Sequence, residues 1–361
     1  MPSSDHIPRW RRPAGVLLVM AMVAALLALA APVGATFKGH NGQIAYVPNY
    51  QPFTPGEIWT ADPDGANAQK LVDLTDPTGY ICAGWYVGTA TGPTWSPDGA
   101  HIAFGNDIDL WVMAADGTNL TRLTTIGTDR IGQPVWSPDG TKLAVVIDTV
   151  LYVVDAAGGG SIAIPSDHGG WFSVSSPPTW SKNGSEIAAV IEQTGAGPHD
   201  IYVIAADGSS QVNITNDERS EHPAWSPNGK EIAFANSEPG YPPSIQAIRP
   251  DGSKRRTIAD LPTPDFWPQW SPNGSSLLFT SYDGSNFLVL VHITKPHGKQ
   301  IIDLPSGDSI CDAVWSPDGS QVLFVDAVGD LWTVDRRVRT APQPLGINGQ
   351  LADWQSVRGR S

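Results

Sequence analysis

Acidic, basic and aromatic side chains gather in short segments that each precede a recurring tryptophan of this 361-residue chain. The residues best suited to binding are Asp129, Arg130, Glu221, His222, Asp265, Trp267 and Asp312. Carboxylates, an imidazole and an indole ring can hold a peptide, a sugar or a protein loop through ion pairs, hydrogen bonds and aromatic contacts. We therefore expect these segments to form a ligand-binding mouth, the alternative being an ordinary solvated loop face.

Residue patterns typical of enzymes are sparse. The sequence contains no Gly-x-Ser-x-Gly motif to present a nucleophilic serine and no glycine-rich phosphate loop beside a helix. Its Asp-Gly pairs are explained by hairpin turns, because no Asp-rich calcium loop with a bidentate glutamate accompanies them. We predict no catalytic residue, no metal ligand and no cofactor.

The tryptophans belong to a pentapeptide, Trp-Ser-Pro-Asp-Gly or a close variant. It begins, at intervals of 41 to 45 residues, at Trp95, Trp136, Trp180, Trp225, Trp270 and Trp315, and a further tryptophan, Trp354, returns without the turn. A period of about 40–50 residues is typical of propellers and other repeat arrays. Proline presets φ, aspartate bonds locally and glycine takes the left-handed conformation, so the motif predicts a tight turn. We expect each tryptophan to be buried against a neighbouring repeat.

Short apolar runs and turn residues fill the rest of each repeat. After Trp95 come Ile102-Ala-Phe104, Leu110-Trp-Val112 and Leu120-Thr-Arg-Leu-Thr124, with Asp116-Gly117 before the last run. Alternating runs joined by Asp-Gly pairs indicate β-hairpins. The abundance of glycine (37) and proline (32) also favours short strands over helices. Each repeat is therefore predicted to be a four-stranded antiparallel blade of a β-propeller.

The two ends of the propeller region carry complementary parts of one blade. Asn41-Gly42 and Ile44-Ala-Tyr46 supply a turn and a strand without a tryptophan, whereas Leu351–Ser356 supplies the tryptophan strand without a turn. Pairing these segments would remove the free edges of the ring. We predict an all-β fold, a seven-bladed propeller formed by residues 36–361 as a single domain. Its ring is closed by the C-terminal strand pairing with the N-terminal blade.

The pattern Trp-Ser-Pro-Asp/Asn-Gly-x-x-Ile/Leu-Ala-Phe resembles the TolB-like repeat, a relative of WD40 repeats, from about Phe37 to the C-terminus. The resemblance implies the fold, but many activities share this scaffold. The chain differs from TolB because no α/β domain precedes the first blade and seven blades are counted instead of six. The resemblance therefore favours a protein-binding or scaffold role at the cell envelope without transferring the role of TolB itself.

A similar scaffold in oligogalacturonate lyase uses a histidine-rich metal site, so a metal-dependent carbohydrate-active lyase or hydrolase is the alternative function. Such a site requires several ligands converging on one ion. We expect His168 and His222 to face the mouth, His199 to lie in a different loop, and the other histidines to fall elsewhere. This scattering favours the binding protein over the enzyme.

The N-terminus is typical of an export signal. Arg9, Arg11 and Arg12 precede an uncharged apolar run from Ala14 to Ala31, and Val33-Gly34-Ala35 offers a cleavage site. We predict that residues 1–35 form a signal peptide, the alternative being an uncleaved N-terminal anchor that would give the protein its one membrane contact. The protein is then periplasmic, extracellular or on the cell surface.

The net charge limits the classes of partner, and the number of cysteines limits the possible disulfides. The formal net charge is -14, and an acidic surface repels phosphate backbones, so we expect no nucleic-acid partner. A protein or peptide partner is the remaining expectation. In an exported protein two cysteines permit one disulfide. Because both lie on approaches to the same mouth, and only the first blade separates their blades, we predict a Cys82–Cys311 bond, the alternative being two isolated buried thiols.

Overall fold

The computed structural model of the chain describes residues 40–48, 57–73, 91–106, 109–126, 130–167, 169–193, 199–237, 243–260, 267–282, 286–293, 295–302, 310–337 and 340–357. The chain divides into two compact units, Met1–Gly34 and Ala35–Ser361, and all of the described strands belong to the second. The regular structure in these ranges is entirely β. They contain no helix long and apolar enough to cross a membrane.

Four-stranded antiparallel sheets are the building blocks of this unit, as the alternating runs predict. One sheet contains β4 (Thr94–Trp95), β5 (His101–Asn106), β6 (Asp109–Ala114) and β7 (Thr121–Arg122). The next contains β8 (Val135–Trp136), β9 (Lys142–Ile147), β10 (Val150–Asp155) and β11 (Ser161–Ile164). Two further sheets comprise β17 (Ser220–Trp225), β18 (Ile232–Asn236), β19 (Ser244–Ile248) and β20 (Arg256–Asp260), and β21 (Gln269–Trp270), β22 (Ser276–Tyr282), β23 (Asn286–His292) and β24 (Lys295–Ile302).

Two sheets depart from this plan. One has five strands, because two short strands, β12 (Trp171–Phe172) and β13 (Thr179–Trp180), both pair with β14 (Glu186–Glu192). Its remaining strands are β15 (His199–Ala205) and β16 (Gln211–Asn213). The other has seven, in the order β25 (Ile310–Trp315), β26 (Gln321–Asp326), β27 (Asp330–Asp335), β28 (Gln343–Val357), β1 (His40–Pro48), β2 (Glu57–Ala61) and β3 (Gln69–Asp73).

The long strand β28 joins the two ends of the propeller region within the seven-stranded sheet. Its first part pairs with β27, where Thr333 lies opposite Gln343. Its second part pairs with β1, where Ile44 lies opposite Trp354. One strand therefore serves as the outer strand of one group and the inner strand of the next.

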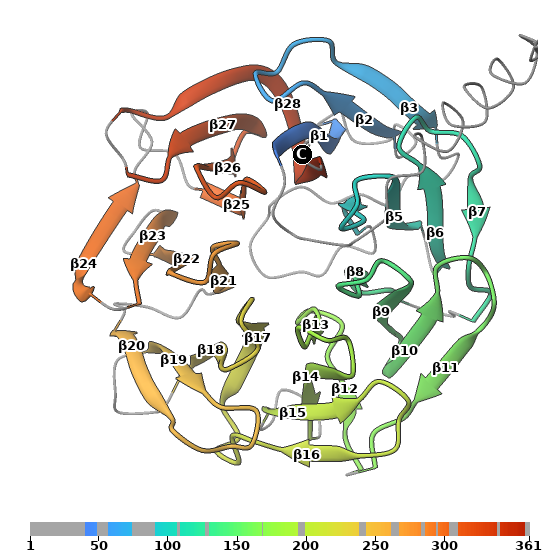
Figure 1. Cartoon of the computed structure of the whole chain (residues 1–361), viewed down its shortest axis with the longest axis vertical. Helices are drawn as coiled ribbons and strands as arrows, with labels where there is room; N and C mark the ends of the chain where they lie inside the picture. Colours follow the sequence, from blue (N-terminus) through green and yellow to red (C-terminus); the bar gives the residue numbers. More distant parts are fainter. Residues whose placement is uncertain are drawn as a thin grey trace, which may run out of the picture. The chain divides into compact units, whose positions relative to one another are not determined.

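The sheets of this unit lie one after another around a common centre, with β8, β13, β17, β21 and β25 nearest to it (Figure 1). The core lies between neighbouring sheets. Trp180 and Phe172, for example, are buried together with Val146 and Leu151 of the preceding sheet. This sheet-on-sheet packing is typical of the blades of a propeller.

The pentapeptide forms the turn between the first and second strands of a blade. In its first copy the Gly99 amide donates to the Ser96 carbonyl at 2.8 Å, and the Ser96 hydroxyl donates to Asp98 Oδ1 at 2.6 Å. Gly99 itself has φ of 69°, which favours glycine. Two of the tryptophans add a hydrogen bond to the preceding sheet in the same way: Trp136 Nε1 donates to the Thr94 carbonyl at 3.0 Å, and Trp180 Nε1 donates to the Val135 carbonyl at 2.9 Å.

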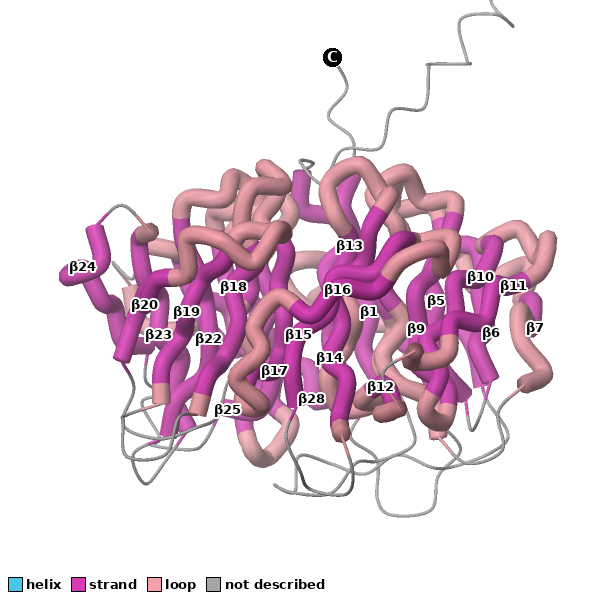
Figure 2. Tube along the Cα trace, turned by 90° about the horizontal axis from the view of Figure 1, so that it is seen from below, coloured by secondary structure: helices cyan, strands magenta, loops and turns pink. Residues whose placement is uncertain are grey.

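Because the strands of a blade are antiparallel, all of these turns lie at one end of the propeller, here named the turn end (Figure 2). The opposite end, here named the mouth end, contains the start of each first strand and the hairpins between second and third strands. The Glu192 end of β14, the His199 end of β15 and the Ser220 end of β17 therefore lie at the mouth end.

Candidate functional site at the mouth end

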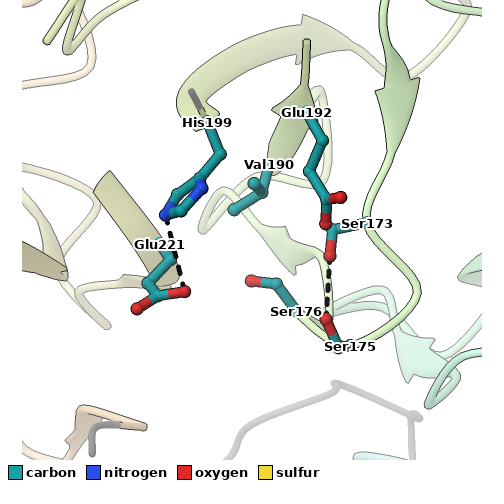
Figure 3. A pocket seen from close by; sticks show the side chains of 7 residues that line it. All are labelled: Ser173, Ser175, Ser176, Val190, Glu192, His199 and Glu221. Carbon is teal, nitrogen blue, oxygen red and sulfur yellow. Dashed lines mark hydrogen bonds and ion pairs between the residues drawn. The ribbon is translucent and has the colours of Figure 1, made fainter. Parts of the chain in front are cut away.

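A small cavity opens at the mouth end between the five-stranded sheet and β17 (Figure 3). Its volume is about 220 Å³. Its walls comprise Ser173, Ser175, Ser176, Val190, Glu192, His199 and Glu221. The cavity is thus built by hydroxyls, carboxylates and one imidazole around a single aliphatic side chain.

Antiparallel pairing explains why these residues meet. Glu192 ends β14 directly opposite His199, which begins β15. The connection that leads into β17 then runs beside β15: the His199 amide donates to the Glu218 carbonyl at 3.1 Å. As a result Glu221 Oε2 lies 3.6 Å from His199 Nε2.

A β-bulge at the start of β17 sets the direction of the next side chain. The register of β17 against β18 shifts between Glu221 and Ala224, and His222 within the shift has φ of 53°. A non-glycine residue with positive φ is uncommon, and bulges often redirect side chains near functional sites. The His222 amide donates to Ser176 Oγ at 3.1 Å, which connects the bulge to the cavity wall.

His222 is largely enclosed and uncharged at neutral pH. Its Nε2 lies 3.7 Å from Glu221 Oε2, while its buried Nδ1 has no hydrogen-bond partner among the described residues. Burial, and then the charge of His199, lower the pKa of His222 to about 3. The ring of His222 is packed against the indole of Trp267, with 4.8 Å between the ring centroids. Trp267 itself remains 47% exposed.

A buried carboxylate holds the connection between β16 and β17 in place. Asp200 accepts hydrogen bonds from Asn213 Nδ2 at 3.0 Å, Thr215 Oγ1 at 2.8 Å, and the amides of Asp217 and Glu218 at 2.8 and 3.0 Å. Burial alone raises the pKa of Asp200, but these donors outweigh it and the pKa lies below its ordinary value. The segment that delivers Glu221 and His222 is therefore fixed by a charged anchor.

A second carboxylate fixes the first residue of β17. Asp217 accepts hydrogen bonds from Ser220 Oγ and from Asn236 Nδ2 at 2.9 Å each, and it pairs with Arg255. The guanidinium of Arg255 lies over the ring of Phe234, 5.2 Å from its centroid. This network therefore holds the start of β17, just before the bulge, in place.

The structure brings together three of the seven residues expected at the mouth. Glu221, His222 and Trp267 form one continuous cluster. Arg130 lies on another blade, where its amide donates to Asp148 Oδ1 at 3.0 Å. Asp312 lies in β25 opposite Val325, beside a bulge comparable with that of His222. The remaining expected sites are outside the described residues or side chains: Asp129, Asp265, His168, Cys82 and the side chains of Asp312 and Cys311.

The expectation for His199 was wrong, because we placed it in a different loop from the mouth residues. It lies beside Glu221 and lines the same cavity. Glu192 and the serines 173, 175 and 176 also line the cavity, although no motif in the sequence marks them. The predicted blade already implies their position. In an antiparallel blade, the hairpin between the second and third strands lies at the same end as the start of the first strand. The segments before each tryptophan form only part of the mouth end, and the hairpins between second and third strands form the rest.

The cluster offers limited means for catalysis. A general base works best with a pKa near the working pH, and the pKa of His222 is far below that range. In the described part of the chain, no group of three or more His, Cys, Asp or Glu side chains is arranged to hold a metal ion. The arrangement is better suited to binding, since it combines an exposed indole with a polar cavity.

Comparison with known proteins supports the propeller fold. Residues 81–261 match the PD40 family, described as the TolB β-propeller domain. No curated protein matches the sequence. TolB from Acinetobacter baumannii is a similar solved structure, with a TM-score of 0.52 at 17% identity over 95% of this chain and 72% of that one.

Enzymes of the same architecture are also similar. An oligogalacturonate lyase in complex with manganese gives a TM-score of 0.57 at 16% identity, over 84% of this chain and 85% of the lyase. A puromycin-hydrolysing peptidase from Mycobacterium tuberculosis gives 0.62 at 15% identity, over 86% of this chain and 54% of the peptidase. At such identities the similarity concerns the fold alone.

Proposed function

Because the chain belongs to the PD40 family of TolB β-propeller domains, we propose that it is a non-enzymatic binding or scaffold protein of the cell envelope. A protein or peptide partner engages its mouth end. Glu221, His222 and Trp267 form the centre of that surface, and Asp129, Arg130, Asp265 and Asp312 contribute from neighbouring segments. The N-terminal 35 residues serve export.

We propose further that the propeller has seven blades and that its C-terminal strand closes the ring. The pairing of β28 with both β27 and β1 supports this proposal, since it divides the seven-stranded sheet into two blades. A core cluster that includes Leu323, Ile44 and Trp354 joins those two groups of strands. Trp95 in β4 is connected to the same strand, because its amide donates to Asp353 Oδ2 at 2.8 Å.

The observation that carries the binding function is the half-exposed Trp267 beside the small polar cavity. Tryptophan is enriched among residues that dominate binding energies at protein interfaces. The cavity, at about 220 Å³, is smaller than the ~300–1,000 Å³ typical of small-molecule sites. It therefore fits one side chain of a larger partner better than a whole oligosaccharide.

Affinity capture from envelope extracts tests this function. Wild-type protein should recover a defined partner whose yield falls at least about tenfold with Trp267→Ala, and also with Asp312→Ala. The matched control is the double variant Asp116→Asn, Asp207→Asn, which changes two exposed turn-end carboxylates and should capture normally. Equal capture by all variants would reject the mouth end. Metal-dependent turnover of a polysaccharide by the purified protein would establish the lyase alternative instead.

A further inference from the structure

The cavity at the mouth end is rich in acceptors for a positive charge. Glu221 lies on one side of it and Glu192 on the other, with serine side chains on a third side (Figure 3). No lysine or arginine is among the residues that line it. A cation entering this space would meet oxygen atoms from several directions, whereas an anion would meet two carboxylates.

The imidazole of His222 adds no positive charge that would cancel these carboxylates. His222 lies 3.7 Å from Glu221, but it stays neutral at physiological pH because it is buried. It is also the residue that connects the cavity to the indole of Trp267. The face of an indole attracts cations, so the approach to the cavity favours the same charge as its interior.

The contacts that the two carboxylates already make favour a lysine over an arginine side chain. Glu192 Oε2 accepts a hydrogen bond from Trp171 Nε1 at 3.3 Å, and Glu221 Oε2 faces the Nε2 atoms of both His199 and His222. One oxygen of each carboxylate is thus already engaged. A guanidinium prefers two parallel bonds to a single carboxylate, whereas an ammonium is a compact charge with three donors that can point to separate acceptors.

From these observations we propose that the cavity is a receptor for one lysine side chain of the partner. The ammonium lies between Glu192 and Glu221, with the hydroxyl of Ser176 as a further acceptor, and the methylene stem runs along Val190. Lysine stems commonly cover apolar surface while the charged end meets polar groups. The inference rests on the proposed binding function and specifies the partner residue that the mouth end recognises.

The direct test uses small probes that isolate one side chain. N-acetyl-lysine methylamide is titrated into the purified protein at pH 8, and the indole N–H resonance of Trp267 is followed by NMR after assignment with Trp267→Phe. N-acetyl-norleucine methylamide has a similar stem without the ammonium, and the arginine analogue has the other cation. We expect saturable shifts with the lysine probe, at least tenfold weaker binding of the norleucine probe, and weaker binding of the arginine probe.

Variants then locate the binding. Glu192→Gln and Glu221→Gln, alone and together, keep the shape of each side chain but remove its charge, and the pair should weaken the lysine probe at least tenfold. The control pair Asp116→Asn, Asp207→Asn makes the same change in net charge at the turn end and should leave binding unchanged. The comparison of probes on wild-type protein needs no variant, so a folding defect in any variant leaves the test valid.

Three outcomes overturn the lysine receptor: equal binding of the norleucine probe, binding that both variant pairs weaken equally, or no saturable binding of the lysine probe. None of these outcomes contradicts the proposed binding function, because that function is tested by capture of a partner through Trp267 and Asp312. Conversely, the lysine probe could bind while Trp267→Ala and Asp312→Ala capture the partner as well as wild type does. That result would reject the proposed function but not the lysine receptor.

Discussion

The two ends of the propeller are built by the same strands but differ in regularity. At the turn end the hydroxyl of Ser137 donates to Asp139 at 2.6 Å, as Ser96 does to Asp98, and the geometry returns in blade after blade. At the mouth end the connections differ in length and composition, and the cluster of His199, Glu221 and His222 lies beside one of them. The repeated residues therefore stabilise the ring, whereas the irregular ones are available for recognition.

The largest effect on stability is expected from loss of the strand that joins the ends of the propeller region. A chain ending at residue 349 loses Trp354, which is buried and donates to the Gly42 carbonyl at 3.0 Å. It also leaves the edge of β1 unpaired. We expect no cooperative unfolding transition in this chain, as followed by circular dichroism in urea. A chain ending at Val357 is the control, and similar transitions in both would contradict ring closure.

Two tryptophans, one from each region, should separate stability from binding. Trp136 is 4% exposed and bonds to the preceding blade, so Trp136→Ala should lower the free energy of unfolding by about 3–5 kcal/mol. Trp267 is 47% exposed, and Trp267→Ala should cost less than about 1 kcal/mol while it weakens partner capture. Urea denaturation of both variants checks this. Equal losses of stability would remove the distinction between the two regions.

Two glycines of the turn end provide a finer test of where β28 lies. Gly99 and Gly140 have φ of 69° and 72°, so alanine strains both by about 1–2 kcal/mol. A Cβ at Gly99 would lie 2.3 Å from the Ser356 carbonyl oxygen in β28, whereas at Gly140 its nearest neighbour is Pro97 Cδ at 3.6 Å. Gly99→Ala should therefore destabilise the protein clearly more than Gly140→Ala in thermal unfolding. The reverse order would place β28 elsewhere.

A further prediction concerns the pH dependence of stability. Since the pKa of His222 is lowered to about 3 in the folded protein, its contribution is complete above the ordinary histidine pKa of ~6.5 and is lost as the pH falls toward 3. Relative to His222→Gln, wild-type protein should lose up to about 1.4 kcal/mol per pH unit in that window. Urea unfolding at pH 7.5, 6 and 5 checks this. Parallel profiles would indicate a solvated imidazole.

The sequence was most informative about the features that repeat. The pentapeptide predicted the turn of Ser96 to Gly99 and the antiparallel blade that follows, because turn residues and alternation act locally. The mouth cavity depends on how separate loops meet, so it could be inferred only partly. Glu221, His222 and Trp267 stood before a tryptophan and were found. Glu192 and His199 lie in a hairpin with no motif, and only the register of β14 and β15 places them beside Glu221.

The central claim is that the partner is bound at the mouth end. A benzophenone amino acid at position 267 and another at position 119, in the β6–β7 turn at the turn end, allow a direct comparison by photo-crosslinking in envelope extracts. We expect a discrete crosslinked protein from position 267, which an excess of unlabelled wild-type propeller reduces by competition, and none from position 119. A crosslink from position 119 alone would contradict it.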